Sequence, residues 1–335
     1  MTTSTALPST ADDPRQAGHD PPHAVATSNG RYYSDPANGN LLVSVTNVLD
    51  QHSKRGLAPA AASQTATWFA DHLPQALRAA VDPEELAAFR TQAASVYQQD
   101  WERRAQLGIR VHRQAEAINL DAPIAPDADA EPFITSYLAW LEDFGVSIGR
   151  DISAAECTVL HRGLGYGGTS DLWVRLRFPT ESSPLIGRYR PRAVPADPLP
   201  TPSGLWLVDI KTSTKHPAST VWSEYPLQLA ALRNAEVALI CPPECRYGAA
   251  EGHGSAHEFE VPQFVGTAIL NLRRDTYGFI PLEASAAEFD AFCHLVPVAR
   301  YFHGQDLRGR KPIRPPNAPP AKPARTKNRS RKESA

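Results

Sequence analysis

The chain is poor in lysine and cysteine and has no long apolar run. Its 335 residues include four cysteines and no N-terminal apolar segment of the kind that a signal peptide has. We therefore expect a reduced, cytoplasmic protein. No apolar stretch approaches the length of a membrane span, so no membrane association is expected. Cys241 and Cys245 could form half of a metal site, but no second close pair of Cys or His completes it; a redox or zinc protein built on this pair is one alternative.

Lysine is scarce before residue 305, and two of the three lysines there lie close together in the sequence. Before residue 305 the only lysines are Lys54, Lys211 and Lys215, and arginine carries nearly every other positive charge. Arginine is a permanently protonated planar fork, whereas lysine is a compact charge whose pKa shifts readily. A lysine in such a chain indicates a role that arginine cannot fill. The alternative is a structural ion pair beside a turn, because Lys211 follows closely after Asp209.

Prolines and charges are unevenly distributed. The 31 prolines crowd residues 1–36, 179–202 and the segment after 312, which is typical of loops, linkers or disordered segments. The net charge is −2, but residues 305–335 carry +8, so the rest of the chain carries −10. We expect a disordered segment at 1–30. We also expect a basic disordered tail at 305–335 that binds nucleic acid or another polyanion, or that is merely solvated.

Residues 31–150 are expected to form a helical N-terminal part, and residues 60–120 have the periodicity of helices, with apolar residues recurring at i, i+3 and i+4. Helices are predicted over Trp68–Ala80, Pro83–Tyr97, Trp101–Ile118 and Pro132–Phe144. The 42% hydrophobic and 21% charged composition is ordinary for a soluble globular protein with one large or two modest cores.

Residues 151–304 change to the short apolar segments of strands. Strands are predicted over Cys157–Leu160, Gly168–Phe178, Leu205–Thr212, Val237–Cys241 and Thr267–Leu272, with helices beginning near Pro226 and over Ala286–Phe302. The Pro- and Arg-rich segment 179–203 is predicted to be an insertion. The pattern favours an α/β fold preceded by a helical N-terminal part.

Acidic residues on these strands need partners, since an isolated buried ion is costly. In Leu205–Thr212 the alternation of side chains places Asp209 and Lys211 on one face and Ile210 on the other. Residues 205–210 otherwise read as a central strand covered on both sides. The strand that carries Asp171 is expected to bury only one face.

The predicted helix 101–118 carries a second group of polar residues. Gly108, His112 and Glu116 are four residues apart, so they share a helix face, and the small Gly108 leaves room beside the other two. The alternative is a hydrogen-bonded His–Glu pair on the surface. With Asp171, Asp209 and Lys211, His112 makes an oxygen-rich set that suits Mg²⁺ or Mn²⁺ and the hydrolysis of a phosphodiester.

The order of these motifs resembles the PD-(D/E)XK nuclease superfamily, in its RecB-like and phage-exonuclease branch. The matching elements are Gly108-x-x-x-His112, Gly168-Thr169-Ser170-Asp171, Asp209-Ile210-Lys211-Thr212 and Gln228-Leu229-Ala230-Ala231. The resemblance implies a restriction-endonuclease-like core, with a mixed central sheet flanked by helices, over about residues 100–300. It implies as metal ligands His112, Asp171, Asp209 and the Ile210 carbonyl, and as catalytic residues Asp171, Asp209, Lys211 and Gln228.

Two departures accompany the match. The tyrosine that follows the family's glutamine by four residues is Leu232 here, so Tyr225 is the candidate for its role, and Glu116 is a further accessory candidate. The four cysteines do not match the arrangement of cluster-bearing relatives, so no iron–sulfur cluster is expected.

The resemblance implies a Mg²⁺- or Mn²⁺-dependent deoxyribonuclease, an exonuclease in phage or bacterial recombination or repair. Its expected partners are DNA and a recombination or phage protein. The alternative is a catalytically weak or inactive module of the same fold that binds nucleic acid or a partner protein.

Overall fold

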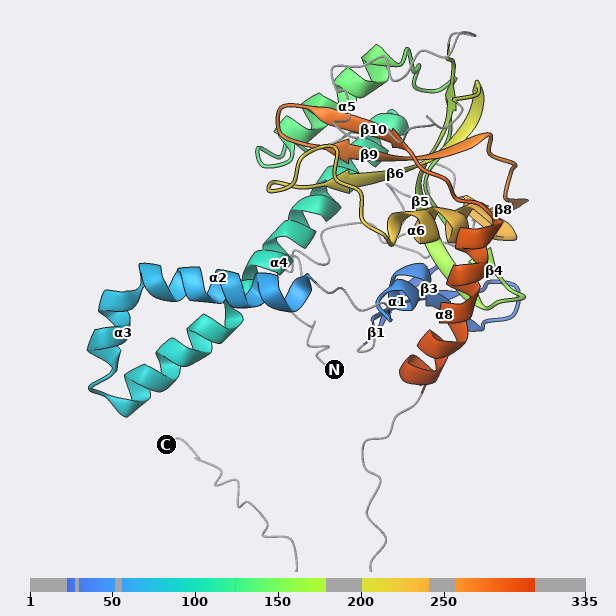
Figure 1. The fold of residues 1–335 in the computed structure, drawn as a ribbon. Coiled ribbons are helices and arrows are strands. Elements are labelled where there is room, and N and C mark those ends of the chain that lie inside the picture. The colour runs from blue at the N-terminus through green and yellow to red at the C-terminus, as the bar shows by residue number, and fades with distance from the viewer. Residues whose placement is uncertain are drawn as a thin grey trace, which may run out of the picture.

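The computed structural model describes residues 23–27, 30–51, 56–123, 125–178, 201–240 and 257–304. These ranges form an α/β protein built on a mixed sheet with helices on both faces (Figure 1). The predictions for the tail 305–335, for Cys241 and Cys245, and for nearly all of the segments 1–30 and 179–203 fall outside the described residues.

The N-terminal part contains β1 (Ala24–Thr27), β2 (Gly30–Ser34), β3 (Leu41–Ser44), α1 (Val45–Leu49), α2 (Leu57–Asp71), α3 (Leu73–Ala79), α4 (Pro83–Asn119) and α5 (Glu131–Asp143). The rest contains β4 (Ile152–His161), β5 (Tyr166–Leu176), β6 (Gly204–Thr212), α6 (Tyr225–Arg233), β7 (Val237–Ile240), β8 (His257–Glu260), β9 (Gly266–Leu272), β10 (Tyr277–Pro281) and α8 (Ala286–Gly304). The predicted strands and C-terminal helices are present, most with shifted ends. The strands β1, β2, β3, β8 and β10 and the helix α1 had no prediction, and the predicted helix Trp68–Ala80 is divided at His72 between α2 and α3.

Two apolar cores separate three layers. One core joins the sheet to α1, α6 and α8 and includes Leu207, Leu229 and Phe292. The other joins the opposite face to the C-terminal half of α4 and to α5, and it includes Val208 and Trp140. Figure 1 accordingly shows α5 on one side of β6, β9 and β10, and α6 and α8 on the other. Strand β6 is therefore covered on both faces, as its sequence predicts.

Strand β5 is the point at which the sheet branches. Along one edge it pairs with β4 over most of its length. Along the other edge it pairs with β3 at Tyr166 and Gly167 and with β6 only from Leu172 onward. Residues 168–171 therefore have no β-ladder partner on that edge, and the sheet forks there.

The prediction that β5 buries only one face is wrong. Leu172, Val174 and Leu176 lie in the core beneath α4 and α5, as expected. Trp173, however, is 3% exposed and packs on the opposite core against the edge of Phe264. The polar residues flanking Trp173 suggested a solvated face, but α6 and the segment before β9 cover it.

The prediction of separate helices over 83–97 and 101–118 is also wrong, because α4 runs without a break for 37 residues. Asp82 caps its N-terminus by accepting a hydrogen bond from the Glu84 amide, and Pro83 occupies the first turn. The polar stretch between the two predicted helices contains neither Gly nor Pro, so nothing interrupts the backbone. The helices α2, α3 and the first half of α4 project from the body as an arm (Figure 1).

The arm has a small core of its own. The Phe89 ring packs against Trp68 and Phe69, at centroid distances of 5.2 and 5.9 Å, and Trp68 stacks on His72. Helix α2 has no buried residue. No helix in the described part of the chain is long and apolar enough to cross a membrane.

A charge network around the buried Asp35 connects the N-terminal strands to the main sheet. The Arg162 guanidinium donates two hydrogen bonds of 2.9 Å to Asp35 and two of 2.6 and 2.8 Å to Glu258. The Asp35 side chain is fully buried, and it also accepts from the Ala37 amide and from Asn38. The Arg162 hydrogen bonds hold the pKa of Asp35 below its ordinary value of 3.8.

We expect Asp35→Ala to lower the free energy of unfolding at pH 7 by about 2 kcal/mol, since it removes the charged hydrogen bonds between the buried Asp35 carboxylate and the partly exposed Arg162 guanidinium. Because the folded-state pKa of Asp35 is lowered, its stabilisation is complete above the unfolded-state pKa and is lost as the pH falls through the folded-state value. Urea unfolding of both proteins across pH 7 to 3 measures this. The difference in unfolding free energy between wild type and Asp35→Ala should become smaller as the pH falls. The control Asp275→Ala, in the exposed β9–β10 turn, should have nearly the unfolding free energy of wild type at each pH. A difference in unfolding free energy that grew at lower pH would contradict this role for Asp35.

Candidate metal centre

Three carboxylates lie in a row across neighbouring strands at the fork. The pairs Ala155–Leu172 and Cys157–Ser170 flank Glu156 of β4, so Glu156 lies opposite Asp171 of β5. Leu172–Val208 is the last pair between β5 and β6, so Asp209 takes the next position, opposite Asp171 on its other side. Like charges directly opposite one another destabilise a sheet. This row therefore requires a positive partner.

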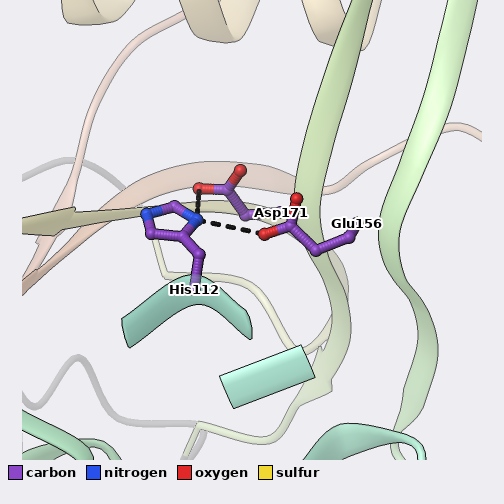
Figure 2. A group of neighbouring side chains, drawn as sticks. All are labelled: His112, Glu156 and Asp171. Atoms are coloured by element: carbon purple, nitrogen blue, oxygen red, sulfur yellow. Dashed lines mark hydrogen bonds and ion pairs between the residues drawn. The ribbon is translucent and has the colours of Figure 1, made fainter. Parts of the chain in front are cut away.

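His112 of α4 faces two of these carboxylates. Its Nδ1 lies 3.0 Å from Glu156 Oε1 and 3.7 Å from Asp171 Oδ2, and Figure 2 shows this one nitrogen directed toward both carboxylates. The other ring nitrogen, Nε2, donates to the Ile210 carbonyl at 3.0 Å. Since a carbonyl can only accept, Nε2 carries the proton, and in the neutral ring Nδ1 has the free lone pair. Histidine ligands of metals are commonly fixed in this way through their second nitrogen.

Glu156 has an unusual backbone. Its φ of 46° lies in the left-handed region, which costs a residue other than glycine about 1–3 kcal/mol. Such strain persists where the surrounding structure imposes it, and it gathers at functional sites. Sequence reasoning missed Glu156, because neither the register of β4 nor this dihedral angle can be read from the residue types. Its only signal was a carboxylate inside an apolar strand.

The donor set fits a divalent cation. One ligand atom from each of His112, Glu156 and Asp171 lies within 4.8 Å of the others. Ligands that share an ion at a bond length of about 2.1 Å lie roughly 3 to 4.2 Å apart, so a small contraction suffices. With His112 neutral, the three carboxylates and the Lys211 ammonium sum to −2, which a divalent ion balances.

The electrostatics of the metal-free site reflect the same crowding. Burial raises the pKa of Asp171 to about 6, although the His112 charge opposes this. Burial alone would lower the pKa of His112, but the Asp171 and Glu156 carboxylates outweigh it and raise the value to about 9. A proton on His112 therefore takes the place of a cation between the two acids.

Asp209 forms a second cluster behind the first. Its Oδ2 lies 2.7 Å from Lys211 Nζ, and its Oδ1 accepts from Gln228 Nε2 at 2.6 Å. Gln228 Oε1 in turn accepts from Lys211 Nζ at 3.1 Å. The side chain of Tyr225 completes the enclosure, because Lys211 Nζ lies 5.3 Å from the centre of its ring. Asp209 and Lys211 share a face, as predicted.

The structure therefore arranges the predicted residues in two linked groups. Asp171 bridges them, since its Oδ2 faces His112 Nδ1 and also accepts from the Ile210 amide at 2.6 Å. The Ile210 carbonyl orients His112, and both Asp209 oxygens face protein donors, so direct ligation by Asp209 or Ile210 stays a prediction. Glu116, 8% exposed, lines the same groove of about 760 Å³ as His112 and Asp171.

Comparison with known proteins adds no assignment. No protein-family model matches the chain, and no curated protein is similar to it. The chemistry of this site is therefore inferred from its own geometry.

We expect Glu156→Gln to weaken Mn²⁺ binding by at least tenfold, since loss of even a residue that supports a ligand costs roughly 10- to 100-fold in affinity. Calorimetric titration of the purified protein measures this. Glu236→Gln is the matched control, because Glu236 pairs with His161 at 2.9 Å elsewhere on the sheet. Equal affinities in wild type and Glu156→Gln would remove Glu156 from the ligand set.

Proposed function

We propose that this protein is a metal-dependent nuclease that hydrolyses phosphodiester bonds in DNA, with a core of the PD-(D/E)XK type. Several features support the proposal: a forked mixed sheet with acids on adjacent strands, a helix that supplies a histidine, and a following helix that supplies a glutamine to the lysine. The observation that carries it is the proximity of a three-residue cation site and the Lys211 ammonium, which are linked through Asp171 and Ile210.

The proposed site residues have two roles, metal binding and stabilisation of negative charge on the phosphate. His112, Glu156 and Asp171 would hold Mg²⁺ or Mn²⁺, which polarises a phosphoryl oxygen and lowers the pKa of a water molecule. Lys211 Nζ lies 2.7 Å from the Asp209 carboxylate and donates to Gln228, and although burial opposes it, the negative charge of Asp209 raises the pKa of Lys211, which favours its ammonium form. It therefore acts as a fixed positive charge that stabilises negative charge developing on the phosphate.

Asp209 and Gln228 position that charge. Together they hold Lys211 Nζ from two sides, so the flexible lysine side chain loses its freedom before the substrate arrives. Asp209 is completely buried, and the low dielectric of its surroundings strengthens its attraction for Lys211. Arg31 and Arg113 line the same groove as the metal-binding residues and suit the flanking phosphates of a DNA strand.

The direct test is digestion of end-labelled linear, circular and single-stranded DNA with Mg²⁺ or Mn²⁺. Cleavage of linear substrates alone would support the exonuclease expected from the resemblance, and cleavage of circles would indicate an endonuclease. Binding without cleavage under all conditions would favour the inactive module instead.

We expect Asp209→Asn to reduce cleavage by at least about a hundredfold, the scale of losing a group that stabilises transition-state charge. The volume is unchanged, but an amide replaces the carboxylate beside Lys211. The rate of cleavage at saturating DNA measures this, with Asp290→Asn on α8 as the control, since that side chain is 76% exposed. Near-normal cleavage by Asp209→Asn would contradict the assignment.

A separate prediction concerns the shape of the lysine. Lys211→Arg keeps a positive charge, but a planar fork cannot replace the compact ammonium between Asp209 and Gln228. We expect it to be nearly as inactive as Lys211→Ala in the same assay. Lys215→Arg is the matched control, because the Lys215 side chain is 52% exposed and an arginine there can keep the surface ion pair with Asp100. Full activity of Lys211→Arg would reduce Lys211 to an ion-pair partner.

A further inference from the structure

A second groove adjoins the metal centre on the side of Lys211. It has a volume of about 340 Å³, at the lower end of the range for ligand sites. Its lining includes Gly108, His112 and Lys211, and these three also line the larger groove. The second groove is therefore continuous with the metal centre.

One wall of this groove is a single face of α4. Trp101, Arg104, Gly108 and His112 all line the groove and are spaced at i, i+3, i+7 and i+11, which places them in one row along the helix. At about 1.5 Å per residue, Trp101 lies about 16 Å along the axis from His112. The row thus begins at an aromatic residue and ends at a metal-binding histidine.

The opposite wall is the segment between β6 and α6, and Trp222 projects from it. This segment is anchored from beneath: Arg273 donates to the carbonyls of His216 and Pro217, and Asn271 donates to those of Ala218 and Thr220. Lys215 Nζ ties it to α4 through Asp100 at 2.9 Å. The wall is therefore held in place without covering the indole of Trp222.

Both tryptophans remain accessible. Trp101 is 55% exposed and Trp222 is 45% exposed, although tryptophan is the side chain with the largest apolar surface to bury. The Trp222 and His216 rings meet in a T-shaped contact at a centroid distance of 5.3 Å and an interplanar angle of 88°, so the His216 ring does not stack flat on the indole. Arg104 and Lys211 add positive charge nearby.

We propose that this groove binds unpaired nucleotides of a DNA strand, with bases stacked on Trp101 and Trp222, while the adjoining phosphodiester lies at the metal centre. Unpaired bases stack readily on aromatic side chains, whereas bases within a duplex already stack on one another. The inference rests on the proposed nuclease function and specifies its substrate as single-stranded DNA or a frayed end.

The charge of the chain supports stacking as a source of affinity. Residues 1–304 carry a net charge of −10, so attraction between the body and phosphates is weak. Stacking releases no counterions, and its contribution is nearly independent of salt. A groove with two exposed indoles beside the cations Arg104 and Lys211 suits binding that depends more on stacking than on charge.

The test measures binding without turnover. A fluorescein-labelled thymidine dodecamer is titrated with the full-length protein in EDTA, and anisotropy gives the affinity. We expect Trp222→Ala and Trp101→Ala each to weaken binding by about 5- to 150-fold, the range for losing one stacked base, with an unchanged slope against salt. Trp222→Phe, which retains an aromatic face, should recover most of the affinity. Phe259→Ala on β8 is the matched control, because Phe259 is 51% exposed and does not line the groove.

The outcomes separate this inference from the nuclease proposal. Wild-type affinity in both tryptophan variants, an equal loss in Phe259→Ala, or no binding of the oligonucleotide by the wild type would each overturn the stacking groove. A groove that binds through its tryptophans in a protein that cleaves no DNA with Mg²⁺ or Mn²⁺ would overturn the nuclease activity and leave the groove established as a binding site.

Discussion

The mutual repulsion of three carboxylates on adjacent strands is the constraint on which the rest of the site depends. Glu156, Asp171 and Asp209 occupy opposing positions of β4, β5 and β6. Charges of one sign at that spacing are stable only with cations close by. Lys211 compensates the charge at the Asp209 end of the row, and His112 compensates the charge at the Glu156 end. Each interaction in the site, including the proton on His112 and the hydrogen bonds of Gln228, compensates part of this repulsion.

The fork in the sheet makes room for the row. Because β3 and β6 share one edge of β5 without meeting, the amide of Ile210 binds the Asp171 carboxylate instead of a strand carbonyl. Gly168 lies in the gap, where a Cβ would come within 2.8 Å of Leu232 Cδ2 and 3.0 Å of Val45 Cγ2. The absence of a side chain at Gly168 lets α1 and α6 pack this close to β5. Helix α6 in turn brings Gln228 to Lys211 and Asp209. The close packing of α6 on β5 at Gly168 thus also sets the position of Gln228 in the site.

Local patterns in the sequence predicted most of this fold and half of the site. Alternation placed Asp209 and Lys211 on one face of a central strand, and helical spacing placed His112 and Glu116 on one face of a helix. Glu156 could not be found in that way, because its place depends on strand register and on one left-handed residue, both fixed by tertiary packing. The start of α4 at Pro83 was predicted, but its continuity was missed, because a polar stretch without Gly or Pro does not interrupt the helical backbone.

The continuity of α4 makes the arm and the metal centre one mechanical part. A helix of 37 residues is a rod of about 55 Å, and His112 lies in its last third, clamped between β4 and β6, while its first half stands outside the body. A rod held near one end acts as a lever. A displacement of the arm would therefore be carried along one unbroken helix to the turn that holds His112 Nδ1 beside the two acids.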